Sequence, residues 1–426
     1  MKITKLEIQA FRSVQSLKFE FHERLNVLVG VNGAGKSSVL DAVAILLSWM
    51  AKRIKQVGGA GRRIESPDDI QNGASQTNLQ ITAHIQGHDV SWNRVQVREG
   101  HRKLRSASNL TAMTEVAKQI QSAITDNSEG VNIPLMAYYP VNRAVLDIPL
   151  RIRAKHRFGL LAAYDDALAG GANFRQFFEW FREREDLENE LRRDQQASFS
   201  NPKAQFPDPQ LEAVRTAITG LMPEFCNLTI RRNPLRMEVE KKGKRLTVNQ
   251  LSDGEKCLIA MVGDLARRMA IANPARERPL EGEGVVLIDE IDLHLHPKWQ
   301  RMIMPCLLKV FPRCQFIVST HSPHVVTQVH AESLFLLSQS EGGLVVEKAE
   351  ESYGKTVERI LEDLMGLETT RPDEVEDQLL RLFEMVDVGC FSEARVLIAE
   401  LVREIGDDPE LVKAEMLMRR KEIIGK

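Results

Sequence analysis

The stretch Gly30–Ser37 reads GVNGAGKS and matches G-x-x-x-x-G-K-[ST], the pattern of a phosphate-binding loop. The run NVLVG leading into it is typical of a short buried strand, and SSVLDAVAILLSWMAKRI after it has the apolar period of a helix. Glycines at 30, 33 and 35 let main-chain N–H groups curl around phosphate oxygens, and the helix N-terminus adds a positive dipole. The sequence therefore predicts a nucleotide site between a strand and a helix. The alternative is a glycine turn that Ser37 caps without any ligand.

The side chains of this loop predict ATP and Mg²⁺ as its ligands. Lys36 is expected to bring a point charge to the outer phosphates, where it counts among the catalytic groups, and the Ser37 hydroxyl to complete the magnesium shell. The other loop residues expected to line the nucleotide are Asn32, Gly33, Ala34, Gly35 and Ser38.

The stretch 287–297, LIDEIDLHLHP, allows two interpretations. Its carboxylates and imidazoles are ligand types for zinc, manganese or iron, which favours a metal cluster. Alternatively, GVVLIDE is a buried strand ending in two acids, where Asp289 holds magnesium and Glu290 is the general base, a role worth roughly 10²–10⁴ in rate. His294 and His296 alternate with leucines, which predicts a β-like segment with both histidines on one side. In the second interpretation they are loop residues at an interface.

Two further stretches complete the expected site. QFIVSTH is another buried strand, and it ends at His321, where a histidine could reach the γ-phosphate. LSDGEK opens a helix and places Ser252 and the Gly254 amide at its N-terminus, a position that suits an anion.

The order of these stretches, with LSDGEK in place of LSGGQ, resembles the ATP-binding-cassette ATPases. The opening LEIQAFRSV is similar to their SMC/RecF-like branch, and the resemblance covers most of residues 1–345. It implies a homodimer, with higher oligomers left open, in which the loop Leu251–Lys256 closes over ATP held by the second copy. Residues that the resemblance adds to the nucleotide site are Arg12, Ser13, Ser252, Gly254, Glu255 and, in the D-loop that crosses the interface, Asp292.

The chain departs from this family between the phosphate loop and the helical insertion. A glutamine usually ends a strand there, whereas this chain has AYYPVNR. Asn142 as an oxygen ligand and Arg143 facing the nucleotide are two functional interpretations. Strand-end packing by Tyr138 and Tyr139 is the structural one.

Composition indicates a globular protein of the cytoplasm. Apolar residues make up 43% and charged residues 27% of the 426, and the net charge is −2, so a nucleic-acid site would have to be a local patch. No apolar run suffices to span a bilayer, and the first residues lack the pattern of a secretory signal, so we expect no membrane association. The scattered cysteines suit a reducing compartment: Cys226, Cys257, Cys306, Cys314 and Cys390.

The predicted fold is α/β, an ATP-binding-cassette ATPase head with a P-loop core and an N-terminal antiparallel β-meander. Residues 1–145 form the first part of the head, 146–225 a helical insertion, and 226–350 the second part with LSDGEK, the acidic strand and the histidine strand. Residues 351–426 form a C-terminal helical region, either a cap on the head or a surface for a partner.

Several features narrow the expected function. The FRS opening and the charged insertion argue against a transporter subunit, and the insertion is too short for a long coiled-coil arm. No DxD follows His321, so a Toprim nuclease of the OLD type is not expected. GKTVERILEDLMGLETTRP and the final helix resemble the PtuA ATPases of Septu anti-phage systems, also found beside retrons. That resemblance implies a sensor or regulator of a separate HNH nuclease, PtuB. The alternative is a RecF-like DNA-repair ATPase without an effector.

Four basic runs leave DNA contact open: KRIKQVGGAGRR, REGHRKLR, RIRAKHR and RRNPLRMEVEKKGKR. Such runs are solvated faces in most proteins, but two that converge would bind a phosphate backbone.

Overall fold

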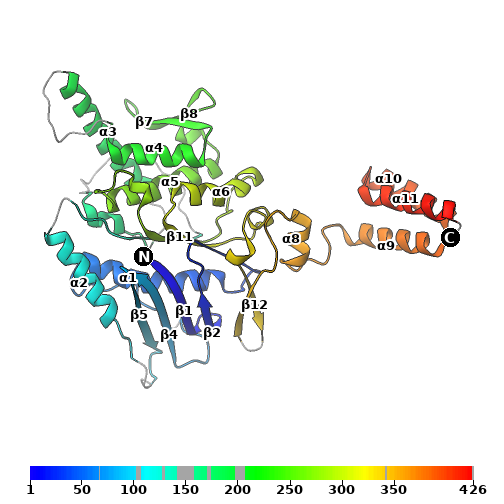
Figure 1. The fold of residues 1–426 in the computed structure, drawn as a ribbon, viewed down its shortest axis with the longest axis horizontal. Helices are drawn as coiled ribbons and strands as arrows, with labels where there is room; N and C mark the ends of the chain where they lie inside the picture. The colour runs from blue at the N-terminus through cyan, green and yellow to red at the C-terminus, as the bar shows by residue number, and fades with distance from the viewer. Residues whose placement is uncertain are drawn as a thin grey trace. The chain divides into compact units, whose positions relative to one another are not determined.

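The computed structural model describes residues 1–66, 68–101, 107–126, 130–141, 158–169, 174–196, 207–340 and 343–424. These form two compact units, Met1–Val357 and Glu358–Lys426, which we call the head and the C-terminal unit. The ribbon in Figure 1 follows the chain through both.

A six-stranded sheet forms the centre of the head. Its order is β13 (Gly343–Lys348), β12 (Leu334–Ser340), β3 (Leu25–Val29), β11 (Cys314–Ser319), β10 (Gly284–Ile288) and β6 (Leu135–Tyr139). All neighbours are parallel except β12 and β13. Every residue of β3, β6, β10 and β11 is buried, as near-continuous apolar runs in a parallel sheet require. The sequence prediction of buried strands at these places is confirmed.

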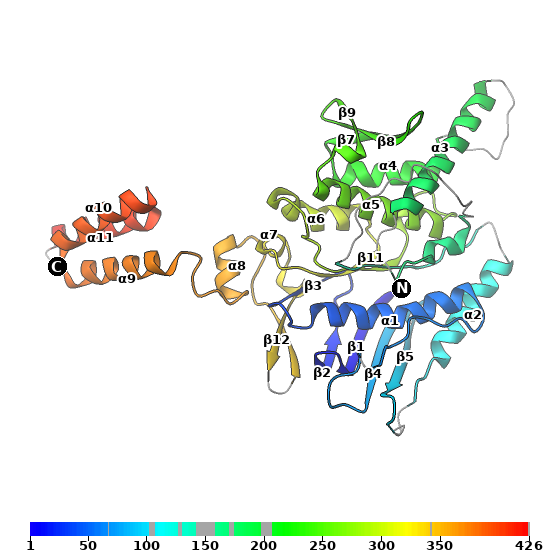
Figure 2. The same cartoon turned by 180° about the vertical axis from the view of Figure 1, so that it is seen from behind.

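An antiparallel meander forms the second sheet, as the alternating sequence predicts. Its order is β2 (Val14–Glu20), β1 (Lys2–Phe11), β4 (Gln76–Ile85) and β5 (His88–Val97). Helix α1 (Lys36–Lys55) contacts strands of both sheets, and 15 of its 20 residues are buried. Figure 2 shows it running across strands β1, β4 and β5 of the meander. The helix that opens at the phosphate loop is therefore held on two sides.

The remaining head elements lie between and after these strands. They are α2 (Thr111–Asp126), η1 (Leu160–Tyr164), α3 (Phe174–Gln196), α4 (Pro209–Leu221), the antiparallel sheet β7 (Phe225–Arg232), β8 (Leu235–Lys241) and β9 (Lys244–Thr247), η2 (Val248–Gln250), α5 (Asp253–Ala272), η3 (Pro279–Glu281), α6 (Pro297–Val310), α7 (Pro323–Val326) and η4 (Ala331–Ser333). Helix α5 packs against α3 so closely that a Cβ at Gly263 would lie 2.7 Å from the ring of Phe177.

The C-terminal unit is helical, as predicted. After α8 (Val357–Asp363) come α9 (Asp373–Val388), α10 (Phe391–Ile405) and α11 (Pro409–Ile424). The last three helices share a small apolar core that includes Leu379, Leu382, Leu401 and Met418. None of the helices in the described ranges has the length and apolarity that a bilayer crossing requires.

Candidate nucleotide site

The predicted motifs meet at one edge of the central sheet. β3, β11 and β10 are parallel neighbours, so their carboxyl ends lie together. The phosphate loop follows β3, His321 follows β11, and Asp289 follows β10. The Thr320 amide donates to the Leu28 carbonyl at 3.1 Å, which fixes the loop after β11 beside the phosphate loop. This is the crevice position at which open α/β sheets bind ligands.

The phosphate loop has a conformation that requires its glycines. Gly33 and Gly35 have φ of +80° and +96°, in the left-handed region that side chains rarely adopt. Gly30 needs its small size instead, because a Cβ there would lie 2.3 Å from the carbonyl oxygen of Leu337 on β12. The loop is thus backed by the β12–β13 hairpin, from which Gln339 also donates to the Gly33 carbonyl at 3.1 Å.

Lys36 is the first residue of α1 and is 5% exposed. Its Nζ donates to the carbonyls of Gly30 at 2.8 Å and Val31 at 3.0 Å, so the ammonium lies under the curl of the loop. Burial lowers its pKa, and the carboxylates of Asp289, Glu290 and Asp292 oppose that shift. The loop lysine and the acids after β10 therefore share one electrostatic environment.

Ser319 orients both acids at the end of β10. Asp289 is 3% exposed and accepts the Ser319 hydroxyl at 2.5 Å, while the same hydroxyl accepts the Glu290 amide at 2.7 Å. Glu290 has φ of +47°, a left-handed conformation that costs a non-glycine residue of order 1–3 kcal/mol. Ser319 belongs to none of the sequence motifs that predict the site. Its only signal was its place at the end of the neighbouring buried strand.

Asp292 connects the loop after β10 to the loop after β11. Its Oδ1 accepts the Thr320 hydroxyl at 2.5 Å and the His321 amide at 3.4 Å. Burial and the nearby Lys36 ammonium lower the pKa of His321 below its ordinary value. The imidazole is therefore mostly neutral at pH 7, with one nitrogen donating and the other accepting.

The LSDGEK segment begins helix α5 with a capping box. The Ser252 hydroxyl accepts the Glu255 amide at 3.4 Å, and Glu255 accepts the Ser252 amide at 3.1 Å. Lys241 of β8 donates to Glu255 at 2.6 Å. Gly254 is placed against residues 291–296, the D-loop, since a Cβ on it would lie 2.3 Å from the His294 carbonyl oxygen. Within one chain, then, the start of α5 contacts the D-loop.

Arg12 and Ser13 form the turn between β1 and β2. The Arg12 guanidinium donates to Asp41 of α1 at 2.5 Å and to Asp69 at 2.8 Å, so it ties this turn to the helix that follows the phosphate loop. Ser13 is exposed in the same turn. Asp41, the partner of Arg12, follows Ser37 by one turn of α1, so Arg12 lies beside the helix one turn beyond that serine.

Of the two histidines of the LHLHP stretch, His294 lies in a turn and His296 directly before a helix, so the expected β-like alternation is wrong. Residues 291–294 form turns, and His294 has φ of +62°. His296 is the N-cap of α6, with Nδ1 accepting the Lys298 amide at 3.2 Å. Capping explains the second histidine without a metal, and the described part of the chain contains no group of three His, Cys, Asp or Glu that could hold one.

The end of β6 is fixed by a buried charge network. Tyr139 donates to Asp264 of α5 at 3.0 Å, and Asp264 also accepts Arg267 and Arg268, each at 2.6 Å. Arg268 donates onward to the carbonyls of Ala163 and Asp165. Burial would raise the pKa of Asp264, but the two guanidiniums lower it. Helix α5 is thereby fastened to β6, whose Tyr139 carbonyl accepts the Asp289 amide at 2.8 Å.

Some predicted residues lie outside the described ranges. Asn142 and Arg143 are among them, and so are the basic run 151–157 and part of the run 98–105. In the basic run 231–245, Arg231 and Arg236 both pair with the buried carboxylate of Glu238, at 3.0 Å and 2.7 Å.

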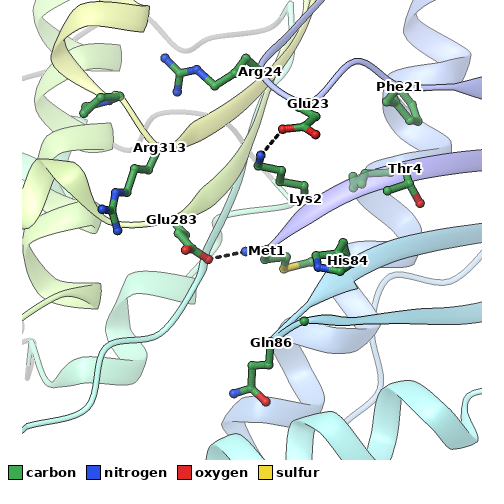
Figure 3. A pocket seen from close by; sticks show the side chains of 13 residues that line it. Met1, Lys2, Thr4, Phe21, Glu23, Arg24, His84, Gln86, Glu283 and Arg313 are labelled. Carbon is green, nitrogen blue, oxygen red and sulfur yellow. Dashed lines mark hydrogen bonds and ion pairs between the residues drawn. The ribbon is translucent and has the colours of Figure 1, made fainter.

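A cavity of about 740 Å³ lies at the amino ends of the central strands (Figure 3). Arg24, Glu283 and Arg313 line it and immediately precede β3, β10 and β11. It is spanned by ion pairs of the Met1 amine with Glu283 at 2.5 Å and of Lys2 with Glu23 at 2.6 Å. Its position at the amino ends of the strands separates it from the nucleotide site.

The site fits Mg²⁺ and a nucleotide triphosphate by its donor set. A glycine cradle held in left-handed conformations and a buried lysine suit phosphate, while the Ser37 hydroxyl and the buried Asp289 carboxylate are hard oxygen ligands suited to magnesium. Fold and site together define an ATPase head with a P-loop core.

Comparison with known proteins identifies the family. Residues 25–327 match the family described as "AAA domain, putative AbiEii toxin, Type IV TA system", and the chain belongs to it. The Retron Ec83 probable ATPase of Escherichia coli is 30% identical, with 99% of this chain and 87% of that protein aligned. Septu protein PtuA of Bacillus thuringiensis is 24% identical, with 87% of this chain and 85% of that protein aligned.

A solved SMC head domain from Thermotoga maritima is also similar, with a TM-score of 0.45 and 16% identity over 82% of this chain and 100% of that one. The chain is thus an ATP-binding ATPase related to the retron ATPases and Septu PtuA, and the predicted resemblance and ATPase activity are confirmed.

Proposed function

We propose that this ATPase is the regulatory subunit of an anti-phage complex and that its ATP cycle controls a separate HNH nuclease. The observation that carries the proposal is the similarity to a retron ATPase along 99% of this chain, the C-terminal unit included. In this proposal, ATP binding and hydrolysis at the nucleotide site switch the nuclease, and the C-terminal unit is the surface that binds it.

In the proposed reaction, Ser37 and Asp289 hold Mg²⁺, and the phosphate loop holds ATP with Lys36 at the outer phosphates. Bound magnesium neutralises charge that develops on the phosphates. Glu290 accepts a proton from the attacking water, and Ser319 keeps its main chain in position through the bond to the amide. Neutral His321 donates a hydrogen bond toward the γ-phosphate.

The active unit in this proposal is a homodimer with two ATP molecules at its interface. Ser252 and Gly254 of one copy meet the nucleotide of the other, where the start of α5 supplies main-chain N–H groups. The Gly254 contact to the D-loop supports this arrangement, because it links the trans-acting segment to the segment that follows Glu290.

The charge of the C-terminal unit favours a protein partner with a basic surface. Of residues 358–426, 18 are acidic and 10 are basic, a formal charge of −8 in a chain whose total is −2. On α9, one exposed stripe combines Asp377, Leu380, Glu384 and Val388, with Leu380 57% and Val388 81% exposed. Apolar side chains amid acids fit a partner that buries the former and pairs with the latter.

The test expresses the chain with its flanking genes, among which the proposal expects one for an HNH protein, and challenges the cells with phage. Protection is expected from the wild type and to be lost with Lys36→Ala, because the phosphate loop then lacks its cation. The Lys52→Ala variant, at an exposed position on the same helix, is the control. Mass determination of the purified complex should show both proteins. Protection by Lys36→Ala would overturn ATP control, and tight DNA binding without any nuclease would favour the RecF-like alternative.

A further inference from the structure

Gln300 joins two loops of the nucleotide site from the side of helix α6. Its Nε2 donates to the Leu295 carbonyl at 2.9 Å and, at 3.5 Å, to the Asp292 carbonyl. Its Oε1 accepts the Ser322 hydroxyl at 2.8 Å. One amide therefore spans the D-loop and the loop that carries His321.

The position of Gln300 follows from how α6 begins. His296 caps the helix and Pro297 occupies its first turn, so the helix direction is fixed four residues before Gln300. Side chains of an α-helix lean toward its N-terminus, which aims Gln300 back at the D-loop. Ser322 is itself fixed, since it is 5% exposed and caps α7 by accepting the Val325 amide at 3.4 Å.

The same two loops are also joined on the side of the sheet. Thr320 donates to the Asp292 carboxylate and accepts the Ser322 amide at 3.0 Å, and the Ile291 amide donates to the Ser319 carbonyl at 3.0 Å. The sheet-side contacts hold the first half of the D-loop. Among the described hydrogen bonds that join the two loops to one another, those of Gln300 reach the far end of the D-loop, at the Leu295 carbonyl.

We propose that Gln300 is a positioning residue for ATP hydrolysis, one that holds the D-loop and the His321 loop together as a single unit. Glu290 immediately precedes the D-loop, and His321 lies in the other loop. The relative position of these two side chains therefore depends on the hydrogen bonds of Gln300 that join the loops. The role lies outside nucleotide binding, because Gln300 contacts neither the phosphate loop nor Lys36 in the described structure. It rests on the ATPase activity and is independent of any nuclease.

The test compares the full-length chain with Gln300→Glu and Gln300→Met. Glu keeps the shape of the side chain and the acceptor but loses both donors, whereas Met keeps the length and loses all hydrogen bonds. Arg301→Ala, at the next and exposed position of α6, is the matched control. Three quantities are measured for each: kcat for ATP, the Kd of a fluorescent ATP analogue, and the midpoint of thermal unfolding without nucleotide.

The expected result is a kcat about tenfold lower or more in both Gln300 variants, with Kd within about threefold of the wild type and little change in the unfolding midpoint. Ser322→Ala removes the bond to Gln300 from the other side, together with the α7 cap, so it should lower kcat and add little to the kcat effect of Gln300→Met. A kcat within twofold of the wild type would overturn the proposal. So would a parallel loss of kcat, Kd and thermal stability, which would show that Gln300 only supports the fold.

Discussion

Glu290 offers the sharpest single-residue test of the reaction. Glu290→Gln keeps the size of the side chain and removes its ability to accept a proton, so we predict a loss of ATP turnover of roughly 10²–10⁴. Nucleotide affinity should remain within about threefold, because Lys36 and the phosphate loop are untouched. Steady-state turnover and titration with a fluorescent ATP analogue give both values. Wild-type turnover by this variant would assign the base elsewhere.

The lowered pKa of His321 predicts that the stability of the fold depends on pH. Its folded pKa is below 6.5 through burial and the Lys36 charge, so between that pKa and 6.5 the unfolded chain binds more protons. Stability should therefore rise with pH across this window and be lost as pH falls through it. His321→Gln should show a smaller loss between pH 7 and pH 5.5 in urea unfolding. His88→Gln, at an exposed position, is the control, and equal losses in wild type and His321→Gln would contradict the assignment.

At the level of single residues, the sequence predicted the groups that belong to local patterns. Lys36, Asp289 and His321 could be predicted because each stands at a fixed place beside a buried strand. Ser319 and Gln300 could not, because Ser319 bonds Asp289 over 30 residues and Gln300 bonds Ser322 over 22, and hydrogen bonds over such separations leave no periodic signal.

Among the elements, α5 is anchored by a charge network whose removal should be costly. Asp264→Asn leaves Arg267 and Arg268 buried without a full counter-charge, and we predict that the free energy of unfolding falls by about 3–5 kcal/mol. Denaturant unfolding followed by tryptophan fluorescence measures this in the head, which holds all four tryptophans.

The control for this prediction is Asp253→Asn at the exposed start of the same helix, where we expect a change within about 0.5 kcal/mol. A similar, small effect of both substitutions would mean that the network adds little to stability.

Most helices and strands could be predicted because their periods are strong. The β-like segment predicted from LHLHP was wrong because the alternation is short. Capping of α6 by His296 determines the local conformation there, not the apolar period. The order of the six central strands was not predictable in this way. It depends on which buried strands become neighbours, and apolar runs such as β10 and β11 carry no pairing information of their own.

For the molecule as a whole, the proposed partner surface yields a test by charge reversal. Asp377→Lys with Glu384→Lys inverts the acidic stripe of α9, and we predict about tenfold weaker association with the nuclease or more. Glu393→Lys with Glu400→Lys makes the same charge change on α10 and should leave association nearly intact.

Affinity by calorimetry and ATP turnover are measured for both double variants. Turnover should stay within twofold of the wild type, because the altered residues belong to the C-terminal unit and the nucleotide site to the head. Equal affinity of both variants for the nuclease would place its docking surface elsewhere.

The left-handed backbone of Glu290 has a consequence for how such a chain evolves. A strain of about 1–3 kcal/mol is a sizeable part of the 5–15 kcal/mol by which folded domains are stable. A mutation to glycine at this position would relieve that strain and abolish the proposed base in a single step. Stability alone therefore favours loss of the acid, so a lineage that keeps Glu290 is under selection for the hydrolysis that the proposed base performs.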